Sequence, residues 1–164
     1  MIRNATARDA PAVSRIYNHY IEHTAVTFEE RSVSPAQMDA RIREVGASFP
    51  WIVAEEGGAV VGYAYATAWR GRSAYRFSVE STVYLDPEAT GRGVGSALYG
   101  ELIMRLRACH FHSVIGGIAL PNDGSVTLHE KFGFRKVAHF REVGRKFDRW
   151  IDVGYWELIL TDGT

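Results

Sequence analysis

Three glycines alternate with other residues in one short segment of the chain, at Gly91, Gly93 and Gly95. The segment follows a strand-like run, 80–85, and precedes a run with the spacing of a helix, 97–109. Glycine lets the backbone approach an anion closely, and the N–H groups at the start of a helix stabilise phosphate. We therefore predict a binding site for a pyrophosphate, with a plain tight turn as the alternative.

Two common phosphate-binding motifs do not match this segment. A P-loop requires Gly-Lys-Ser/Thr, and no lysine follows the glycines here. The dinucleotide fingerprint requires a third glycine where this chain has Leu98. The expected ligand is therefore a phosphate-bearing cofactor of another class.

Glu80 lies on the strand that leads into the glycines and is the candidate general base. Amines with a pKa of about 8 to 10 are mostly protonated at neutral pH, so an amine nucleophile needs a base to remove its proton. A carboxylate upstream of a phosphate cradle is placed to do this, directly or through water. The alternative is a solvent-facing glutamate paired with an arginine.

Length and composition limit the number of domains and the classes of partner. The 164 residues suit a single domain, 1–164, with one sizeable core. The 19 basic and 19 acidic side chains balance, which argues against nucleic acid or an anionic membrane as a partner. The single cysteine, Cys109, is predicted to be structural, and the histidines show no metal-ligand spacing, so we expect no metal. We see no signal peptide or membrane span and expect a soluble cytoplasmic protein.

The elements that must position these residues form a mixed α/β pattern. Period-2 alternation and turn signals predict strands at 2–5, 51–55, 59–69, 76–85, 113–120, 134–143 and 151–160. Helical spacing and capping residues predict helices from Thr6 to about 21, from Ser34 to about 47, and at 97–109 and 125–132. A charged loop is expected between the last two strands.

The segment from Ser81 to Leu98 resembles motif A of the GNAT superfamily of acyl-CoA-dependent N-acyltransferases, whose signature is R/Q-x-x-G-x-G/A. This chain departs from the signature at Thr90, where the family usually has Gln or Arg. Downstream, Asn122, Ser125 and the Phe132-Gly133-Phe134 sequence resemble motif B. The resemblance implies a mixed, largely antiparallel sheet with helices on both faces.

The same resemblance implies acetyl-CoA as the cosubstrate, with its pantetheine between two strands that splay apart near Glu80 and Ile115. The residues implied in holding it are Val83, Tyr84, Leu85, Gly91, Arg92, Gly93, Val94, Gly95, Ser96, Asn122 and Ser125. Main-chain N–H groups near Tyr84 and Leu85 are expected to polarise the thioester carbonyl. His129 stands where many members have a tyrosine that protonates the departing thiolate; the alternative is a packed histidine.

Over nearly its whole length the chain is also similar to the phosphinothricin acetyltransferase group, with Tyr75, the 79–84 run and Leu120-Pro121-Asn122-Asp123 among the shared features. The 144–150 segment resembles members that acetylate methionine sulfoximine and methionine sulfone. This likeness implies acetylation of the α-amine of a small amino-acid analogue, with Glu80 as base, by an enzyme that is typically a homodimer. We expect direct transfer in a ternary complex, because no suitable nucleophile lies near Glu80.

The candidate acceptor-binding residues are Phe28, Arg70, Arg72, Tyr75, Lys146 and Trp150. Arginine side chains bind carboxylate or phosphinate groups in bidentate fashion, although two loop arginines also suit a solvated turn. Lys146 and Trp150 are expected to close the pocket, from the same subunit or from a neighbouring one. Two other functions stay open: acetylation of a protein N-terminus or a polyamine, and a non-catalytic acetyl-CoA sensor.

Overall fold

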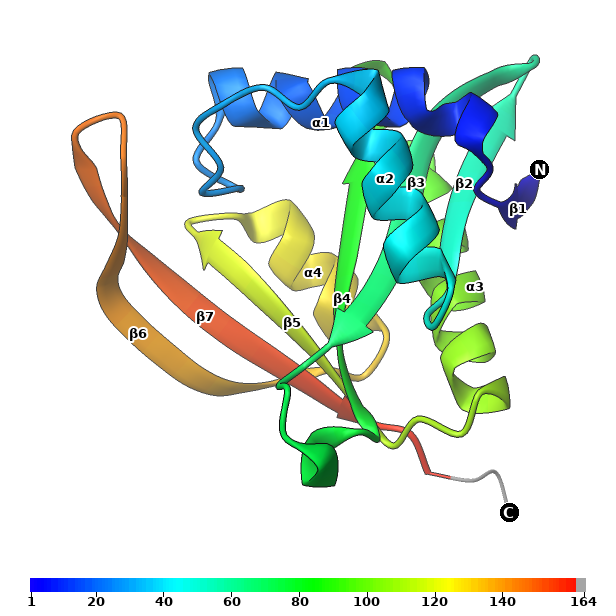
Figure 1. Ribbon diagram of the computed structural model, residues 1–164. Helices are drawn as coiled ribbons and strands as arrows, with labels where there is room; N and C mark the ends of the chain where they lie inside the picture. Colours follow the sequence, from blue (N-terminus) through cyan, green and yellow to red (C-terminus); the bar gives the residue numbers. More distant parts are fainter. Residues whose placement is uncertain (162–164) are drawn as a thin grey trace.

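Seven strands form one mixed sheet in the computed structural model, which describes residues 1–161 (Figure 1). In chain order they are β1 (Ile2–Asn4), β2 (Trp51–Glu56), β3 (Ala59–Ala68), β4 (Ser78–Leu85), β5 (Ser113–Leu120), β6 (Arg135–Lys146) and β7 (Arg149–Ile159). Across the sheet the order is β1-β2-β3-β4-β5-β7-β6, and only β4 and β5 are parallel neighbours. The predicted mixed, mostly antiparallel sheet is confirmed.

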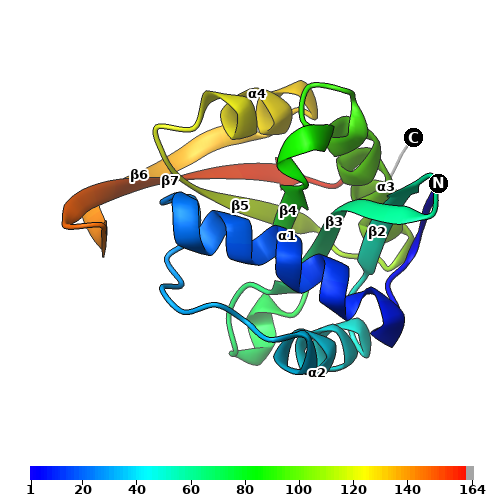
Figure 2. The same cartoon turned by 90° about the horizontal axis from the view of Figure 1, so that it is seen from above.

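In the described part of the chain, four helices cover the two faces of this sheet. They are α1 (Ala10–His23), α2 (Pro35–Gly46), α3 (Val94–Ala108) and α4 (Asp123–Lys131); short 3₁₀ turns are η1 (Ala7–Asp9), η2 (Ser73–Tyr75) and η3 (Pro87–Ala89). The helices α1 and α2 lie on one face and α3 and α4 on the other (Figure 2). Each face has its own apolar core, because each helix buries one stripe of side chains against the strands. The buried stripes include Val13 and Ile16 of α1, Met38 and Ile42 of α2, and Leu98, Leu102 and Leu106 of α3.

Capping residues explain where two helices begin. Ser34 caps α2, since its hydroxyl accepts from the Gln37 N–H at 3.1 Å and the Gln37 side chain accepts from the Ser34 N–H at 2.9 Å. Asp9 accepts from the Thr6 N–H at 2.7 Å, but the turn that this pair opens is the 3₁₀ turn η1, and α1 follows it.

The helices α3 and α4 both begin earlier in the chain than predicted. The helix α3 starts at Val94, three residues before the expected position, so Val94, Gly95 and Ser96 form its first turn. The helix α4 starts at Asp123 instead of residue 125. The reason is its cap: the side-chain oxygen of Asn122 accepts from the Ser125 N–H at 3.2 Å.

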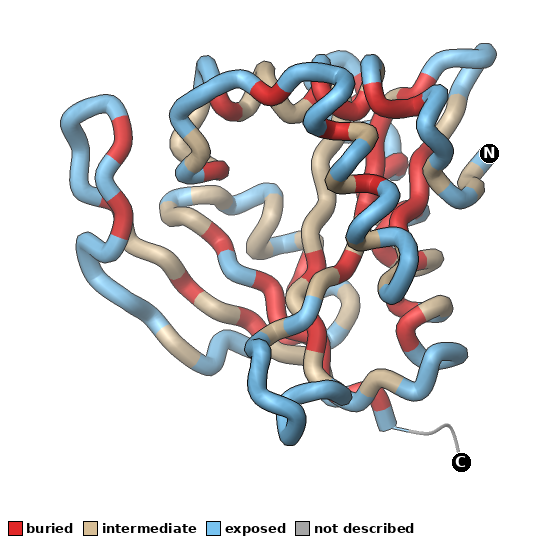
Figure 3. Tube along the Cα trace, viewed as in Figure 1, coloured by how far each residue is buried: buried red, intermediate tan, exposed pale blue. Residues whose placement is uncertain are grey.

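The predicted charged loop between the last two strands is wrong. Strands β6 and β7 continue to a two-residue turn, Phe147 and Asp148, whose φ angles of 51° and 56° match the type I′ turn that suits the twist of a hairpin. The β6–β7 hairpin therefore extends beyond the rest of the sheet, with most of its residues exposed (Figure 3). Within residues 1–161, none of the helices combines the length and the apolarity that crossing a bilayer requires.

Candidate active site

A cleft opens where β4 and β5 separate. The two strands pair only at three positions, ending at Glu80 opposite Ile115, and β5 then continues beside β7 alone. Figure 1 shows the two strands diverging beneath α1. A cavity of about 820 Å³ fills the gap, and it extends from Glu80 to the glycine turn after β4. The splayed strands expected near Glu80 and Ile115 are present.

The register of β4 decides which of its backbone groups face the cleft. Asp86 N–H donates to the Val61 carbonyl at 2.8 Å, and Trp69 N–H donates to the Ser78 carbonyl at 3.2 Å. Because antiparallel pairs alternate between bonded and non-bonded positions, the even-numbered residues of β4 bond to β3. The N–H groups of Val83 and Leu85 therefore face the gap, whereas that of Tyr84 is used within the sheet.

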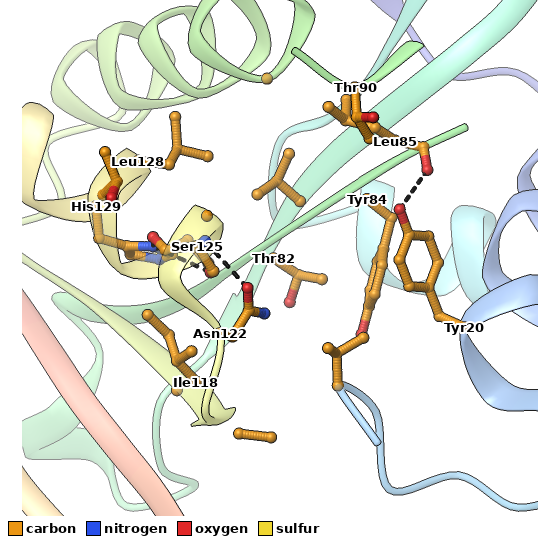
Figure 4. Close-up of a pocket in the computed structure, with 18 of the residues that line it drawn as sticks. Tyr20, Thr82, Tyr84, Leu85, Thr90, Ile118, Asn122, Ser125, Leu128 and His129 are labelled. Carbon is orange, nitrogen blue, oxygen red and sulfur yellow. Dashed lines mark hydrogen bonds between the residues drawn. The ribbon is translucent and has the colours of Figure 1, made fainter. Parts of the chain in front are cut away.

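Side chains of β4 alternate between the two faces of the sheet. The ring of Tyr84 packs against Tyr17 and Tyr20 of α1, with ring centroids 5.2 Å and 5.0 Å apart. The Tyr20 hydroxyl donates to the Leu85 carbonyl at 2.6 Å, and this contact holds α1 over the end of the strand (Figure 4). The Ser81 hydroxyl bonds to the Tyr99 hydroxyl of α3 on the other face, at 2.7 Å. The edge of the cleft is thus fixed from both sides.

The three alternating glycines have different roles. Gly91 and Gly93 adopt φ angles of 72° and 83°, a left-handed region that favours glycine, and a Cβ on either would meet no atom within 4 Å. Both line the cavity, and Gly93 caps α3 without a side chain, which leaves the first helical N–H groups open to a ligand. Gly95 instead packs closely, since a Cβ there would lie 3.3 Å from Leu85. The segment thus has the open backbone and uncapped helix start that the predicted phosphate site requires.

Other side chains in this region are not arranged as predicted. Arg92 is exposed and pairs with Glu56, and Val94 is buried, so neither lines the cavity. Ser96 lines it, and its hydroxyl accepts from the Lys131 ammonium at 2.9 Å. Lys131 comes from the end of α4 and was not predicted, because no local motif marks it. It places a positive charge beside the cradle.

His129 is held in a fixed orientation inside the protein. Its Nδ1 donates to the Ser125 carbonyl at 2.7 Å, and its ring packs edge-on against Tyr99 and Phe134. The Nε2 side faces Gly116, where an added Cβ would lie 2.7 Å from His129 Cδ2. Burial lowers the pKa of His129, so the neutral ring is favoured. This geometry favours the packed alternative for His129, although the ring also borders the cavity (Figure 4).

Glu80 lies at the closed end of the cleft and is half-buried. Burial raises the pKa of its carboxyl, and the positive charge of Arg70 opposes that rise. A Cβ on Gly117 would lie 3.4 Å from Glu80 Oε1 and 3.0 Å from the ring of Tyr155, so the glycine keeps this end of the cleft open. A carboxyl with a raised pKa, reached from a cavity, has the properties of a general base.

The predicted acceptor-binding residues separate into two groups. Phe28 lines the cavity with Glu80, and its ring leaves no room for a side chain at Gly144 of β6. None of the other five predicted residues lines the cavity within one chain; they are Arg70, Arg72, Tyr75, Lys146 and Trp150.

These five residues lie around η2 or on the β6–β7 hairpin, outside the cavity lining. Arg72 and Tyr75 are exposed around η2, and Arg70 stacks on Trp69 at 4.8 Å, close enough to affect Glu80. Lys146 was expected to close the pocket, but its ammonium is buried and donates to the Thr27 carbonyl at 2.9 Å. Trp150, on the outer part of the hairpin, is 61% exposed.

Sequence reasoning missed one wall of the cavity. The segment between α1 and α2, residues 24–34, contributes Val26 and Thr27 as well as Phe28. Tyr20 of α1 borders the same space. Neither the segment nor the helix carries a recognisable motif, so only the packing reveals them. Among the described residues, no group of His, Cys, Asp and Glu side chains is placed to hold a metal ion.

The chain is similar to known acetyltransferases over most of its length. A family model described as an acetyltransferase (GNAT) domain matches residues 2–154. The phosphinothricin N-acetyltransferase of Streptomyces viridochromogenes is 43% identical over 95% of this chain and 85% of its own length. The L-methionine sulfoximine/L-methionine sulfone acetyltransferase of Salmonella typhimurium is 37% identical over 98% of this chain and 95% of its own length.

A solved structure shows the same fold. The crystal structure of a GNAT superfamily phosphinothricin acetyltransferase from Sinorhizobium meliloti, in complex with acetyl-CoA, has a TM-score of 0.95 and 38% identity to this chain. The match covers 100% of this chain and 90% of that one. The predicted fold and enzyme class are thereby confirmed, and the chain belongs to the GNAT family of acetyltransferases.

Proposed function

We propose that this enzyme transfers the acetyl group of acetyl-CoA to the α-amine of a small amino-acid analogue. The acceptors we expect are phosphinothricin, methionine sulfoximine and methionine sulfone, after which two of its relatives are named. The observation that carries the proposal is a cleft that has Glu80 at its closed end and the glycine cradle at its other end. A phosphate-bearing acyl donor bound in the cradle reaches the carboxylate along this cleft.

Backbone N–H groups and one lysine are proposed to bind the acyl donor. Gly91, Gly93 and the first turn of α3 offer backbone N–H groups to the diphosphate, with the Lys131 ammonium nearby. The N–H groups of Val83 and Leu85 face the gap, where they bind the amide groups of the pantetheine arm or polarise a carbonyl oxygen. Acetyl-CoA supplies the activated acetyl group when it is bound.

Glu80 prepares the acceptor. Its carboxylate attracts the ammonium form of the amine and removes one proton, directly or through water, so that the nitrogen lone pair becomes available. A raised pKa suits this task because it makes the carboxylate a stronger base. Direct transfer is favoured because the single cysteine, Cys109, lies exposed at the end of α3 and does not line the cavity.

The test measures release of free coenzyme A against a panel of acceptors. The panel contains phosphinothricin, methionine sulfoximine, methionine sulfone, ordinary amino acids, spermidine and a short peptide with a free N-terminus. We expect turnover with the amino-acid analogues, and Glu80→Gln should lower kcat/KM by about 10²- to 10⁴-fold, the usual contribution of a general base. Binding of coenzyme A, measured by calorimetry, should remain close to wild type.

A matched control separates loss of the base from loss of a carboxylate in general. Glu157 is also half-buried and lies opposite Ile115 on β7, but it does not line the cavity. Glu157→Gln should retain wild-type turnover. Equal activity in the wild type and Glu80→Gln would remove the base role, and turnover with spermidine or the peptide alone would redirect the proposal to those acceptors.

We also propose that two copies of the chain associate through the β6–β7 hairpin. Its exposed apolar side chains are Val137, Phe140, Val143, Phe147 and Trp150, each at least half exposed. Exposed apolar side chains gathered on one element favour association. Light scattering should give a dimer for the wild type, and Phe140→Ser should shift it toward the monomer. A monomeric wild type at micromolar concentration would contradict the proposal.

A further inference from the structure

The α1–α2 loop (residues 24–34) is a wall of the cavity that regular secondary structure does not hold in place. It contributes Val26, Thr27 and Phe28 to the lining of the same cavity that Glu80 lines. The position of Phe28 therefore affects the space available to an acceptor. Contacts from outside the loop must fix that position.

One set of contacts joins the loop to both neighbouring helices. The Tyr17 hydroxyl of α1 donates to the Glu29 carboxylate and bonds to the Thr27 hydroxyl at 2.8 Å. Arg41 of α2 binds the same carboxylate through two guanidinium nitrogens, at 2.6 Å and 2.9 Å. This Tyr17–Glu29–Arg41 cluster links α1 and α2 through the loop that connects them.

The cluster is connected to the cavity by direct packing. Tyr17 contacts Tyr84, which lines the cleft, and Thr27 is both a cluster partner and a lining residue. On its other side the loop is held by the Lys146 ammonium, which donates to the Thr27 carbonyl. Phe28 is thus placed between two anchors, one on the helices and one on the hairpin.

Global stability does not explain a cluster of this kind. The side chains of Glu29 and Arg41 are 38% and 42% exposed, and exposed ion pairs contribute only about 0 to 1 kcal/mol. A bidentate carboxylate–guanidinium pair nevertheless fixes geometry strongly. Arg41 and, after it, Tyr17 hold the pKa of Glu29 below its usual range, so the pair is charged wherever the enzyme is active at neutral pH.

We propose that the Tyr17–Glu29–Arg41 cluster positions the α1–α2 loop and thereby sets the affinity for the acceptor. The inference rests on the proposed function for the identity of the acceptor. The three residues act through Thr27 and Phe28 and are positioning residues. Loss of the pair lets the wall move, whereas the glycine cradle and the gap-facing amides of β4 remain in place.

Kinetics of Arg41→Ala test this directly. The acceptor KM should rise about tenfold, the lower end of the contribution of a hydrogen bond to a charged group, because the pair is partly exposed. The KM for acetyl-CoA should stay within about twofold of wild type, and kcat should change less than the acceptor KM. Arg41→Lys, which keeps the charge, should recover part of the acceptor affinity.

The same helix provides a matched control. Arg43 also pairs with a carboxylate, Asp39, on an exposed surface of α2, with the two side chains 2.9 Å apart. Arg43→Ala removes an equivalent ion pair that has no contact with the loop. It should leave both KM values unchanged. An equal effect of the Arg41 and Arg43 substitutions would overturn the proposal, as would a rise in the KM for acetyl-CoA that matches the rise for the acceptor.

A second measurement does not depend on activity. Arg31 is exposed within the loop and is a site for trypsin. Cleavage after Arg31 in the folded protein should be several-fold faster in Arg41→Ala than in the wild type or in Arg43→Ala. Unchanged cleavage would overturn the positioning role even if no acceptor is turned over. Faster cleavage without turnover of any acceptor would leave the loop anchored as proposed and reject the proposed function alone.

Discussion

Substitution of Gly93 by alanine separates the conformational role of the glycine cradle from its role in binding. Gly93 has a φ of 83°, and a Cβ added there meets no protein atom within 4 Å. Gly58, in the turn between β2 and β3, has a φ of 82° and the same open surroundings, but it does not line the cavity. The two positions therefore share a left-handed φ and open surroundings, and of the two only Gly93 lines the cavity.

The expected loss of stability is the same for both. An L-residue other than glycine in the left-handed region costs about 1 to 2 kcal/mol. In a chain of this size each kcal/mol lowers the melting temperature by about 2 to 4 °C, so Gly93→Ala and Gly58→Ala should each melt about 2 to 8 °C below the wild type. Differential scanning fluorimetry without ligand measures this loss.

The expected loss of affinity is different. A methyl group at Gly93 enters the space that the cradle leaves for a diphosphate and disturbs at least one N–H contact to a charged oxygen. Such a hydrogen bond contributes about 1.5 to 3 kcal/mol, which corresponds to a loss of about 10- to 100-fold in affinity for coenzyme A. Calorimetry should show this loss for Gly93→Ala and wild-type affinity for Gly58→Ala. Equal affinities in the two variants would refute the assignment of the cradle as the diphosphate site.

Three further outcomes follow from the packing and the electrostatics. Gly116→Ala places a methyl group against His129 and should lower the free energy of unfolding by about 1 to 3 kcal/mol. In the double variant with His129→Ala, the loss should be smaller than the sum of the losses in the two single variants. Urea unfolding measures these losses, and additive losses would contradict the contact. Arg70→Ala removes the charge that opposes the raised pKa of Glu80. The base role proposed for Glu80 requires its deprotonated form. The acidic limb of the kcat/KM profile should therefore move to higher pH, and an unmoved limb would contradict the coupling. Ser34→Ala removes the cap of α2 and should lower the free energy of unfolding by about 0.5 to 2 kcal/mol, measured by thermal unfolding. Both KM values should stay unchanged. No loss of stability would contradict the capping role.

Local sequence signals were sufficient for much of the framework. The alternation of β3, the capping box at Ser34 and the turn at Gly57-Gly58 each depend on residues a few positions apart. The glycine segment was predictable for the same reason, because Gly91 and Gly93 need a conformation that other residues rarely adopt. The errors at helix starts also had local causes, such as the cap that Asn122 provides for α4.

Contacts between distant segments could not be predicted in the same way. The sequence placed Arg70 and Arg72 in one loop, but only the packed structure brings Arg70 close enough to Glu80 to affect its pKa. No sequence pattern indicates a partner for Lys146. In the fold its ammonium is buried against the carbonyl of Thr27, 119 residues away. Such pairs depend on how whole elements pack, and no short pattern encodes that.

The sequence by itself determined the order of strands and helices and the glycine cradle, because these follow from backbone preferences over a few residues. It also gives the carboxylate upstream of the cradle directly, as Glu80. The tertiary structure decided the rest of the site. The early end of β4–β5 pairing opened the cleft, the register of β4 turned Val83 and Leu85 toward it, and the Tyr17–Glu29–Arg41 cluster set one wall. These features arise from burial and hydrogen bonding between elements far apart in the chain, which take effect only once the chain is folded.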